Sequence, residues 1–222
     1  MHPTVNAFAE LVLGACCPGC GVAAFGLCPD CRRELTDSPV LLTHCAGIPV
    51  AAGGAYRGVL RQAVLVAKER HGLALLDPLA VVLQHALLAL RPGFPALLVP
   101  VPTAKARVQQ RGVDLPRDVA LRAARKLRAS GADVQVSAAL KLVRTPLDQS
   151  ELGAAARKEN VRGALSWRTA ANLRGAGSRT EVIIVDDLIT TGATLAEAVR
   201  ACADVGVTVV GAACLARPVF DP

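Results

Sequence analysis

The chain has 222 residues, enough for one full domain and a small additional module. Hydrophobic residues make up 52% of the chain and charged residues 19%, and this balance excludes an intrinsically disordered protein. The formal net charge of +7 favours anionic partners such as phosphates, nucleotides or nucleic acid, and it equally fits a basic surface that binds none of them.

The N-terminal segment contains one motif that resembles an export signal. Residues 13–16 read Leu-Gly-Ala-Cys, like a bacterial lipoprotein cleavage box. A secretion signal needs a basic start and roughly 7–15 apolar residues, whereas this segment has no Lys or Arg and carries Glu10. The longest apolar run, around 79–90, contains Gln84 and His85 and is shorter than the roughly 18–20 residues of a membrane span. We therefore expect a cytoplasmic protein without a membrane span.

Six of the eight cysteines lie in the first 45 residues, and four of these form two Cys-x-x-Cys pairs. Each pair presents two thiolates to one side of a metal, and two pairs complete a tetrahedral zinc site. A pair of disulfides is the alternative, which a reducing cytosol disfavours. We predict a structural zinc ion bound by Cys17, Cys20, Cys28 and Cys31.

Three neighbouring side chains leave the exact ligand set open. Cys16 could replace Cys17, and His44 and Cys45 could belong to a second, degenerate half-site. A module of this size cannot hold a fold through a hydrophobic core alone, so the metal would substitute for one. We expect a zinc-binding module over residues 1–50 and a second domain over 51–222, with the Ala-Ala-Gly-Gly stretch at 51–54 as the joint.

Beyond this module, amphipathic stretches with helical spacing alternate with short, continuously apolar runs. Helices are expected at about 56–70, 75–90, 116–129 and 192–205, and strands at 96–101, 134–140, 181–186 and 207–215. Residues 145–160 are expected to form a polar loop and a short helix, and 173–178 a turn. This alternation predicts an α/β fold whose parallel sheet is covered by helices on both faces. Ligands bind such sheets at the carboxyl ends of the strands.

The strand expected at 181–186 leads into the most informative part of the chain. Four apolar residues typical of a buried strand precede Asp186 and Asp187, and two adjacent carboxylates at such a place are costly unless they have a role. Backbone amides, hydroxyls and the helix dipole in the following loop favour a phosphate, and two carboxylates can accept hydrogen bonds from the vicinal hydroxyls of a ribose. Helix capping would explain one or two of these residues but not the whole set. The loop consists of Leu188, Ile189, Thr190, Thr191, Gly192, Ala193 and Thr194.

Residues 182–194 resemble the signature of the type I phosphoribosyltransferases: a hydrophobic run, two acidic residues and a T-T-G-x-T loop. The resemblance implies the type I phosphoribosyltransferase fold and a site for phosphoribosyl pyrophosphate (PRPP) bound together with Mg²⁺. It implies that Asp186 and Asp187 hold the ribose hydroxyls and that residues 188–194 hold the 5-phosphate. With Arg111, the two aspartates would form the catalytic set for transfer of phosphoribose to an acceptor.

Further stretches resemble the ComF/GntX family, a branch of these proteins with an N-terminal zinc module. The resemblance is carried by Tyr56-Arg57-Gly58 and Lys68, Val99-Pro100-Val101-Pro102, Arg111-Gly112, and the spaced residues Thr145 to Gln149, Leu152, Arg157 and Asn160. It implies that Val101, Pro102 and Thr103 face the pyrophosphate. The basic residues that could neutralise it are Lys105, Arg107 and Arg111, with Lys68 and Arg157 as further candidates. Taken individually, Lys105 fits a solvated surface charge better.

The chain departs from that family pattern just after Arg111-Gly112. Asp114 stands where the family has Asn, and Leu115-Pro116 replaces Gln-Ala. A carboxylate there would repel a pyrophosphate unless a metal bridged the two. We therefore still expect the site to bind PRPP, but we treat catalytic turnover of PRPP as a separate question.

Two hypotheses compete with the interpretation that the protein is a phosphoribosyltransferase enzyme. The resemblance to ComF-type proteins implies a role in DNA uptake, with single-stranded DNA or a helicase-like competence protein as the partner of the basic helix over Arg122–Arg128 and of the zinc module. The few aromatic residues available for base stacking argue against it. A PRPP-sensing regulator is the other alternative. The sequence identifies neither the acceptor nor the oligomeric state.

Overall fold

The computed structural model describes residues 16–69, 72–90, 95–144, 159–168 and 180–219. The strands are β1 (Leu41–Cys45), β2 (Ile48–Ala52), β3 (Ala96–Pro100), β4 (Val134–Val136), β5 (Leu140–Leu142), β6 (Leu165–Trp167), β7 (Glu181–Leu188) and β8 (Val209–Ala216). The helices are α2 (Pro29–Thr36), α3 (Gly58–Glu69), the 3₁₀ turn η1 (Leu73–Leu75), α4 (Leu76–Ala89), α5 (Lys105–Arg111), α6 (Leu115–Ala129) and α8 (Ala193–Ala203).

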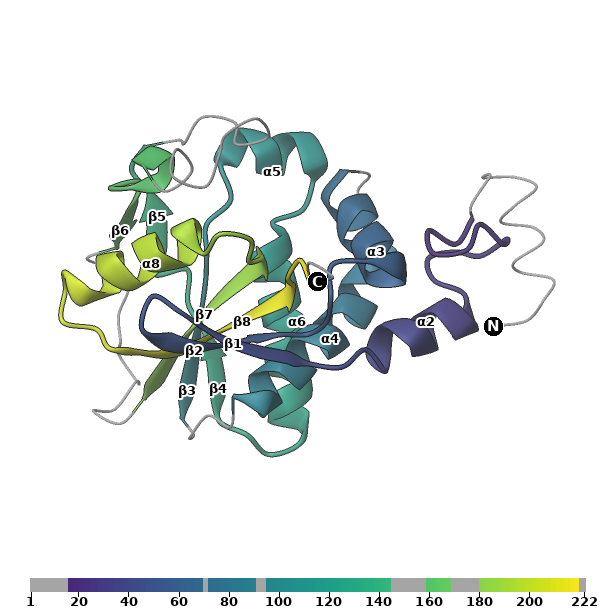
Figure 1. Ribbon diagram of the computed structural model, residues 1–222, viewed down its shortest axis with the longest axis horizontal. Helices are drawn as coiled ribbons and strands as arrows, with labels where there is room; N and C mark the ends of the chain where they lie inside the picture. Colours follow the sequence, from purple (N-terminus) through teal and green to yellow (C-terminus); the bar gives the residue numbers. More distant parts are fainter. Residues whose placement is uncertain (1–15, 70–71, 91–94, 145–158, 169–179, 220–222) are drawn as a thin grey trace.

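The centre of the molecule is a six-stranded sheet with the order β1-β2-β8-β7-β3-β4. All neighbouring pairs in it are parallel except β1 with β2, which form an antiparallel hairpin (Figure 1). A separate sheet of two antiparallel strands, β5 and β6, lies beside α8. The mostly parallel sheet flanked by helices confirms the α/β fold expected from the sequence.

Alternate residues of the central strands pack into two different hydrophobic layers. In β7, Ile183 and Val185 face the layer built with α3, α4 and α6. Val182 and Ile184 face the layer built with α8, β5 and β6. Side chains alternate between the two faces of a strand, so a strand that is apolar throughout is buried on both sides. This explains why residues 182–185 carry no polar residue.

The hairpin of β1 and β2 belongs to the central sheet. β2 pairs in parallel with β8, so that Val50, Ala51 and Ala52 lie opposite Ala212, Ala213 and Cys214. Its turn contains Ala46 and Gly47, both at positive φ. The hairpin therefore attaches part of the first 50 residues to the sheet, and the domain boundary at residue 50 stays a prediction.

The main elements follow the sequence expectations, but α2, β1, β2 and β6 were not expected, and three further details differ. The single strand expected at 134–140 is two strands, β4 and β5, which belong to different sheets. The helix α5 was not expected, because its seven residues include none that is buried and so show no apolar periodicity. β7 runs on to Leu188, which places both aspartates inside the strand rather than after it. The turn expected at 173–178 and most of the loop at 145–160 lie outside the described residues.

Among the described residues, no helix combines the length and the apolar character that crossing a bilayer requires.

Candidate functional site

Asp186 and Asp187 are neighbours near the end of β7, and both line one cavity. Asp186 is buried, and its Oδ1 accepts a hydrogen bond of 2.8 Å from the backbone amide of Asp187. Burial, reinforced by the adjacent Asp187 carboxylate, raises the pKa of Asp186 to about 8. Two carboxylates held this close favour a ligand or cation that can compensate their charge.

Lys68, at the end of α3, supplies part of that compensation. Its Nζ lies 2.8 Å from Oδ2 of Asp187, and both side chains are mostly buried, with 23% and 19% of their surfaces exposed. From the family resemblance we expected Lys68 to contact pyrophosphate. In the structure Lys68 forms an ion pair with Asp187, and it lines a cavity together with Asp186 and Asp187.

The loop between β7 and α8 forms the floor of the site. Gly192 occupies the N-cap position of α8 in the left-handed conformation, with φ of 73°. The Thr191 hydroxyl accepts a hydrogen bond of 3.4 Å from the backbone amide of Ala193. Thr190 and Thr194 line the adjacent cavity, whereas the Thr191 hydroxyl bonds to the first backbone amide of α8. Loop amides, hydroxyls and the positive end of a helix dipole are the features that bind phosphate.

The loop after β3 forms the opposite wall. Val101, Pro102 and Thr103 line the cavity together with Arg107 and Arg111 of α5. The parallel pairing of β3 with β7 brings this loop beside the acidic pair, because the carboxyl ends of both strands lie at the same edge of the sheet.

Asp114 stands behind this wall rather than in the cavity lining. Its Oδ1 accepts a hydrogen bond of 3.0 Å from the hydroxyl of Thr103. Burial raises the pKa of Asp114, and the hydrogen bond from Thr103 opposes that rise. Asp114 thus holds the side chain of Thr103, which lines the cavity. A carboxylate in this position would repel a pyrophosphate less than a carboxylate in the lining itself.

The cavity is partly open to solvent and has a volume of about 320 Å³. Its last wall is apolar and was not found from the sequence, because it is assembled from three separate segments. These are the residues before and at the start of α6, the end of β5, and the residues that lead into β6. The residues of this wall are Val113, Leu115, Pro116, Leu142, Val161, Ala164 and Leu165.

Several expected site residues lie away from the cavity lining. Ile189 is buried, and its backbone amide bonds to the Ala216 carbonyl. Gly192 and Ala193 also lie outside the cavity lining. Arg157 falls outside the described residues, so its proposed contact with pyrophosphate stays a prediction.

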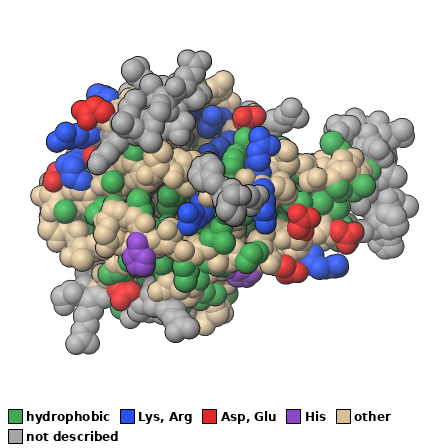
Figure 2. Space-filling view, viewed as in Figure 1, with side chains coloured by type: hydrophobic (Ala, Val, Ile, Leu, Met, Phe, Trp, Pro, Cys, Tyr) green, Lys and Arg blue, Asp and Glu red, His purple; other side chains and the backbone are tan. Residues whose placement is uncertain are grey.

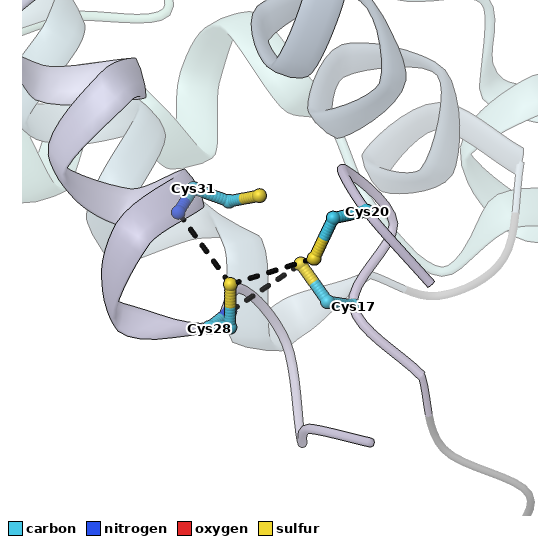
Figure 3. Close-up of side chains that lie close together, drawn as sticks. All are labelled: Cys17, Cys20, Cys28 and Cys31. Atoms are coloured by element: carbon cyan, nitrogen blue, oxygen red, sulfur yellow. Dashed lines mark hydrogen bonds between the residues drawn. The ribbon is translucent and has the colours of Figure 1, made fainter. Parts of the chain in front are cut away.

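The four cysteines expected to bind zinc come together at the N-terminal module (Figure 3). The ligand atoms of Cys17, Cys20, Cys28 and Cys31 all lie within 4.8 Å of one another, and the sulfurs of Cys20 and Cys28 are 3.6 Å apart. Ligands about 2.3 Å from a tetrahedral zinc ion are about 3.8 Å apart, so the spacing fits this metal. Although burial opposes it, backbone amides, that of Cys28 first, lower the pKa of Cys17 to about 7. The cluster can therefore hold a zinc ion.

The alternative ligands are placed elsewhere or left outside the cluster. Cys16 is exposed and is not part of the four-sulfur group. His44 and Cys45 lie on β1, where the Cys45 sulfur is 3.9 Å from the carbonyl oxygen of Gly192. The idea of a second half-site built on His44 and Cys45 is not supported within the described residues.

A parallel α/β sheet that ends in an acidic pair, a threonine-rich loop at a helix N-terminus and a basic opposite wall defines the type I phosphoribosyltransferase class of fold and site. The sequence model of the phosphoribosyl transferase domain matches residues 60–219, and the chain belongs to this family. No curated protein matches the chain. The four cysteines, α2, β1 and β2 precede the matched region.

Proposed function

We propose that this protein binds PRPP with Mg²⁺ and transfers its phosphoribose to an acceptor, as a member of the ComF/GntX branch of the family. The observation that carries the proposal is the meeting of Asp186 and Asp187 with the loop at 188–194 around one cavity. The four-cysteine module supports the ComF/GntX assignment, because that branch carries a zinc module before its transferase domain. A reduced cysteine cluster of this kind also fits a cytoplasmic location.

Each part of the cavity suits one part of PRPP. The loop at 188–194, the phosphate loop, would hold the 5-phosphate. The carboxylates of Asp186 and Asp187 would accept hydrogen bonds from the ribose hydroxyls. Arg107, Arg111 and Lys68 would face the pyrophosphate. Mg²⁺ binds oxygen ligands such as carboxylates and phosphates, and it would be held here by PRPP and the acidic pair. Fixed positive groups around the leaving pyrophosphate would stabilise the charge that develops on it.

The nucleic-acid alternative finds less support on α6 than the sequence suggested. Arg122 and Arg125 both approach Asp77, at 3.6 and 3.7 Å, and Arg128 donates to the Val134 carbonyl. These three arginines already have partners within the protein, so less of their positive charge is available to bind a phosphate backbone. Basic side chains do gather on the upper half of the face shown in Figure 2, and a polyanion remains a second candidate ligand for that surface. Phosphate-dominated binding would weaken steeply with added salt, and salt-independent or absent binding of a single-stranded oligonucleotide would remove this candidate.

The melting temperature of the protein with PRPP and Mg²⁺ tests the proposal. A ligand present at 100 times its Kd stabilises the native state by about 2.7 kcal/mol, which is roughly 5–10 °C for a chain of this size. The double variant Asp186→Ala, Asp187→Ala should lose this shift. Asp133→Ala removes an exposed carboxylate just before β4, at the opposite edge of the sheet, and should keep it. No shift in the parent protein would refute the site assignment.

Release of pyrophosphate then separates the enzyme from the PRPP-sensing alternative. Incubation of PRPP and Mg²⁺ with a pool of small metabolites should release pyrophosphate above the rate without protein. A melting shift without any release would support the sensing alternative.

A further inference from the structure

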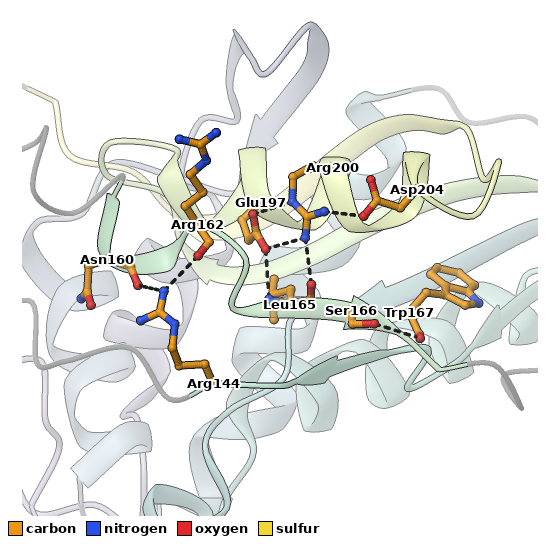
Figure 4. A network of polar contacts seen from close by, with 9 residues as sticks. All are labelled: Arg144, Asn160, Arg162, Leu165, Ser166, Trp167, Glu197, Arg200 and Asp204. Atoms are coloured by element: carbon orange, nitrogen blue, oxygen red, sulfur yellow. Dashed lines mark hydrogen bonds and ion pairs between the residues drawn. The ribbon is translucent and has the colours of Figure 1, made fainter.

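The apolar wall of the cavity depends on a very small sheet. Leu142 and Leu165 come from β5 and β6, which have three residues each and, in the described part of the chain, pair only with one another. A two-stranded hairpin is marginally stable in water, so such a sheet needs outside support to hold a wall in place. Within the described residues, that support comes chiefly from α8 (Figure 4).

The contact is made by a buried carboxylate on α8. Oε1 of Glu197 accepts a hydrogen bond of 3.0 Å from the backbone amide of Leu165. Arg200, one turn further along, donates to both oxygens of Glu197 at 2.8 and 2.9 Å. It also donates to the Leu165 carbonyl oxygen at 3.0 Å. Glu197 and Arg200 together satisfy both backbone polar groups of Leu165, as a neighbouring strand would.

The burial of Glu197 shows that this contact is more than a surface ion pair. Only 5% of the residue is exposed, and a buried charge is costly unless it is paired and hydrogen-bonded. Burial raises its pKa, but the hydrogen bonds from Arg200 and from the Leu165 amide outweigh that effect and lower it overall. Asp204 also pairs with Arg200, but its side chain is exposed.

The same helix carries both parts of the site. α8 follows Gly192, carries the cavity-lining Thr194 in its first turn, and holds Glu197 and Arg200 in the next two turns. We propose that Glu197, supported by Arg200, is a positioning residue that fixes the apolar wall at a set distance from the phosphate loop.

The hydrogen bonds from Glu197 and Arg200 to the backbone of Leu165 form a tether between α8 and β6. This inference rests on the proposed function for the identity of the ligand, but not for the tether itself. Under the proposed function, the 5-phosphate lies in the loop and the apolar wall contacts the group joined to C1 of the ribose. Loss of the tether should therefore weaken contacts to that group and leave the phosphoribose contacts intact.

Hydrogen exchange of the ligand-free protein tests the tether directly. In Glu197→Ala, amides of residues 161–167 should exchange at least about tenfold faster, while those of β7 stay unchanged. Glu197→Gln keeps an oxygen for the Leu165 amide and should restore most of the protection. Asp204→Ala removes the other carboxylate from Arg200 and serves as the matched control, with no expected change. Equal protection of 161–167 in Glu197→Ala and the parent protein would overturn the proposal.

If Glu197→Ala unfolds as a whole, Arg200→Gln provides the second test. This variant removes the donor to the Leu165 carbonyl from a partly exposed position and should also raise exchange at 161–167. Unchanged exchange there would overturn the proposal equally.

Ribose 5-phosphate and uridine 5′-monophosphate test the link to the cavity, because they differ by the ring at C1. The parent protein should bind the nucleotide more tightly, and Glu197→Ala should lose at least about fivefold of that difference while its Kd for ribose 5-phosphate stays within about twofold. Asp204→Ala should retain the difference. A uniform loss for both ligands, or a parent protein that does not distinguish them, would contradict the positioning role. If the parent protein binds neither, the proposed function fails, and hydrogen exchange still decides the tether.

Discussion

The thiol of Cys45 lies against the backbone of Gly192, although 147 positions separate the two residues in the chain. The sulfur is 3.9 Å from the Gly192 carbonyl oxygen, and a Cβ atom added to Gly192 would lie 2.1 Å from it. The tip of the N-terminal hairpin thus packs against the loop that we propose holds phosphate. A cysteine that the sequence offered as a metal ligand has a packing role at the other site.

We expect Gly192→Ala to be destabilising for two separable reasons. The left-handed φ of 73° costs a side chain roughly 1–2 kcal/mol, and the contact with Cys45 adds a steric penalty. Gly206 has φ of 74° with no atom near its Cβ position, so Gly206→Ala measures the first cost alone. Chemical denaturation should show a larger loss in the free energy of unfolding for Gly192→Ala than for Gly206→Ala. Adding Cys45→Ala to Gly192→Ala should recover the difference between the two losses. Equal losses at the two glycines would contradict the packing role of Cys45.

We expect the stability of the ligand-free protein to depend on Asp186 between pH 4 and 8. Its pKa is raised from 3.8 to about 8, so the folded state holds an extra proton in that range. The resulting loss of stability is absent below about pH 4, grows as pH rises and is complete near pH 8. Asp186→Asn should flatten the profile of Tm against pH and raise Tm at pH 8 by a few degrees, about 2–4 °C per kcal/mol. The exposed Asp133→Asn should keep the parent profile.

The affinity for PRPP with Mg²⁺ should have the opposite pH dependence. The proposed ligand requires the carboxylate form of Asp186, so binding releases a proton below the raised pKa. The Kd should fall by up to about tenfold per pH unit as the pH rises toward 8 and then level off. Calorimetry in buffers of different ionisation enthalpy would measure the released proton. Affinity that is flat from pH 6 to 8 would contradict a role for the ionised carboxylate.

Asp114 should act in two ways, through the hydrogen bond that it accepts from Thr103 and through its negative charge. Asp114→Asn keeps an oxygen that can accept from the Thr103 hydroxyl, and it removes a negative charge from behind the pyrophosphate wall. PRPP affinity should rise about threefold to tenfold, by weaker repulsion. Asp114→Ala loses the hydrogen bond, which should cost about 1 kcal/mol of stability and lower the affinity. If the Asn and Ala variants bind PRPP equally, the anchoring role is wrong.

The cysteine cluster should hold one zinc ion that stabilises the N-terminal module. Cys31→Ser removes one of the four sulfurs and should abolish stoichiometric zinc, with a loss of about 2–3 kcal/mol or roughly 5–10 °C in Tm. Cys16→Ser changes an exposed neighbour outside the cluster and should leave both unchanged. Elemental analysis and thermal unfolding measure the two effects. A metal-free protein with unchanged Tm would contradict the zinc assignment.

The sequence by itself determined the features that depend on local patterns. The apolar run before Asp186 indicated a strand buried on both faces, and the glycine and threonines that follow indicated an anion-binding loop. The two Cys-x-x-Cys turns indicated one metal cluster. Each of these signals lies within a few residues, where strand alternation, helix capping and turn geometry act directly on the chain.

Only the tertiary structure decided how distant segments meet. The sheet order and strand register place Lys68 on Asp187, Cys45 on Gly192 and Glu197 on Leu165. No local periodicity encodes these contacts, because each joins elements whose relative positions follow from the packing of the whole sheet. The apolar wall has the same origin, since its residues become neighbours only when β5, β6 and the start of α6 close over the carboxyl end of the sheet.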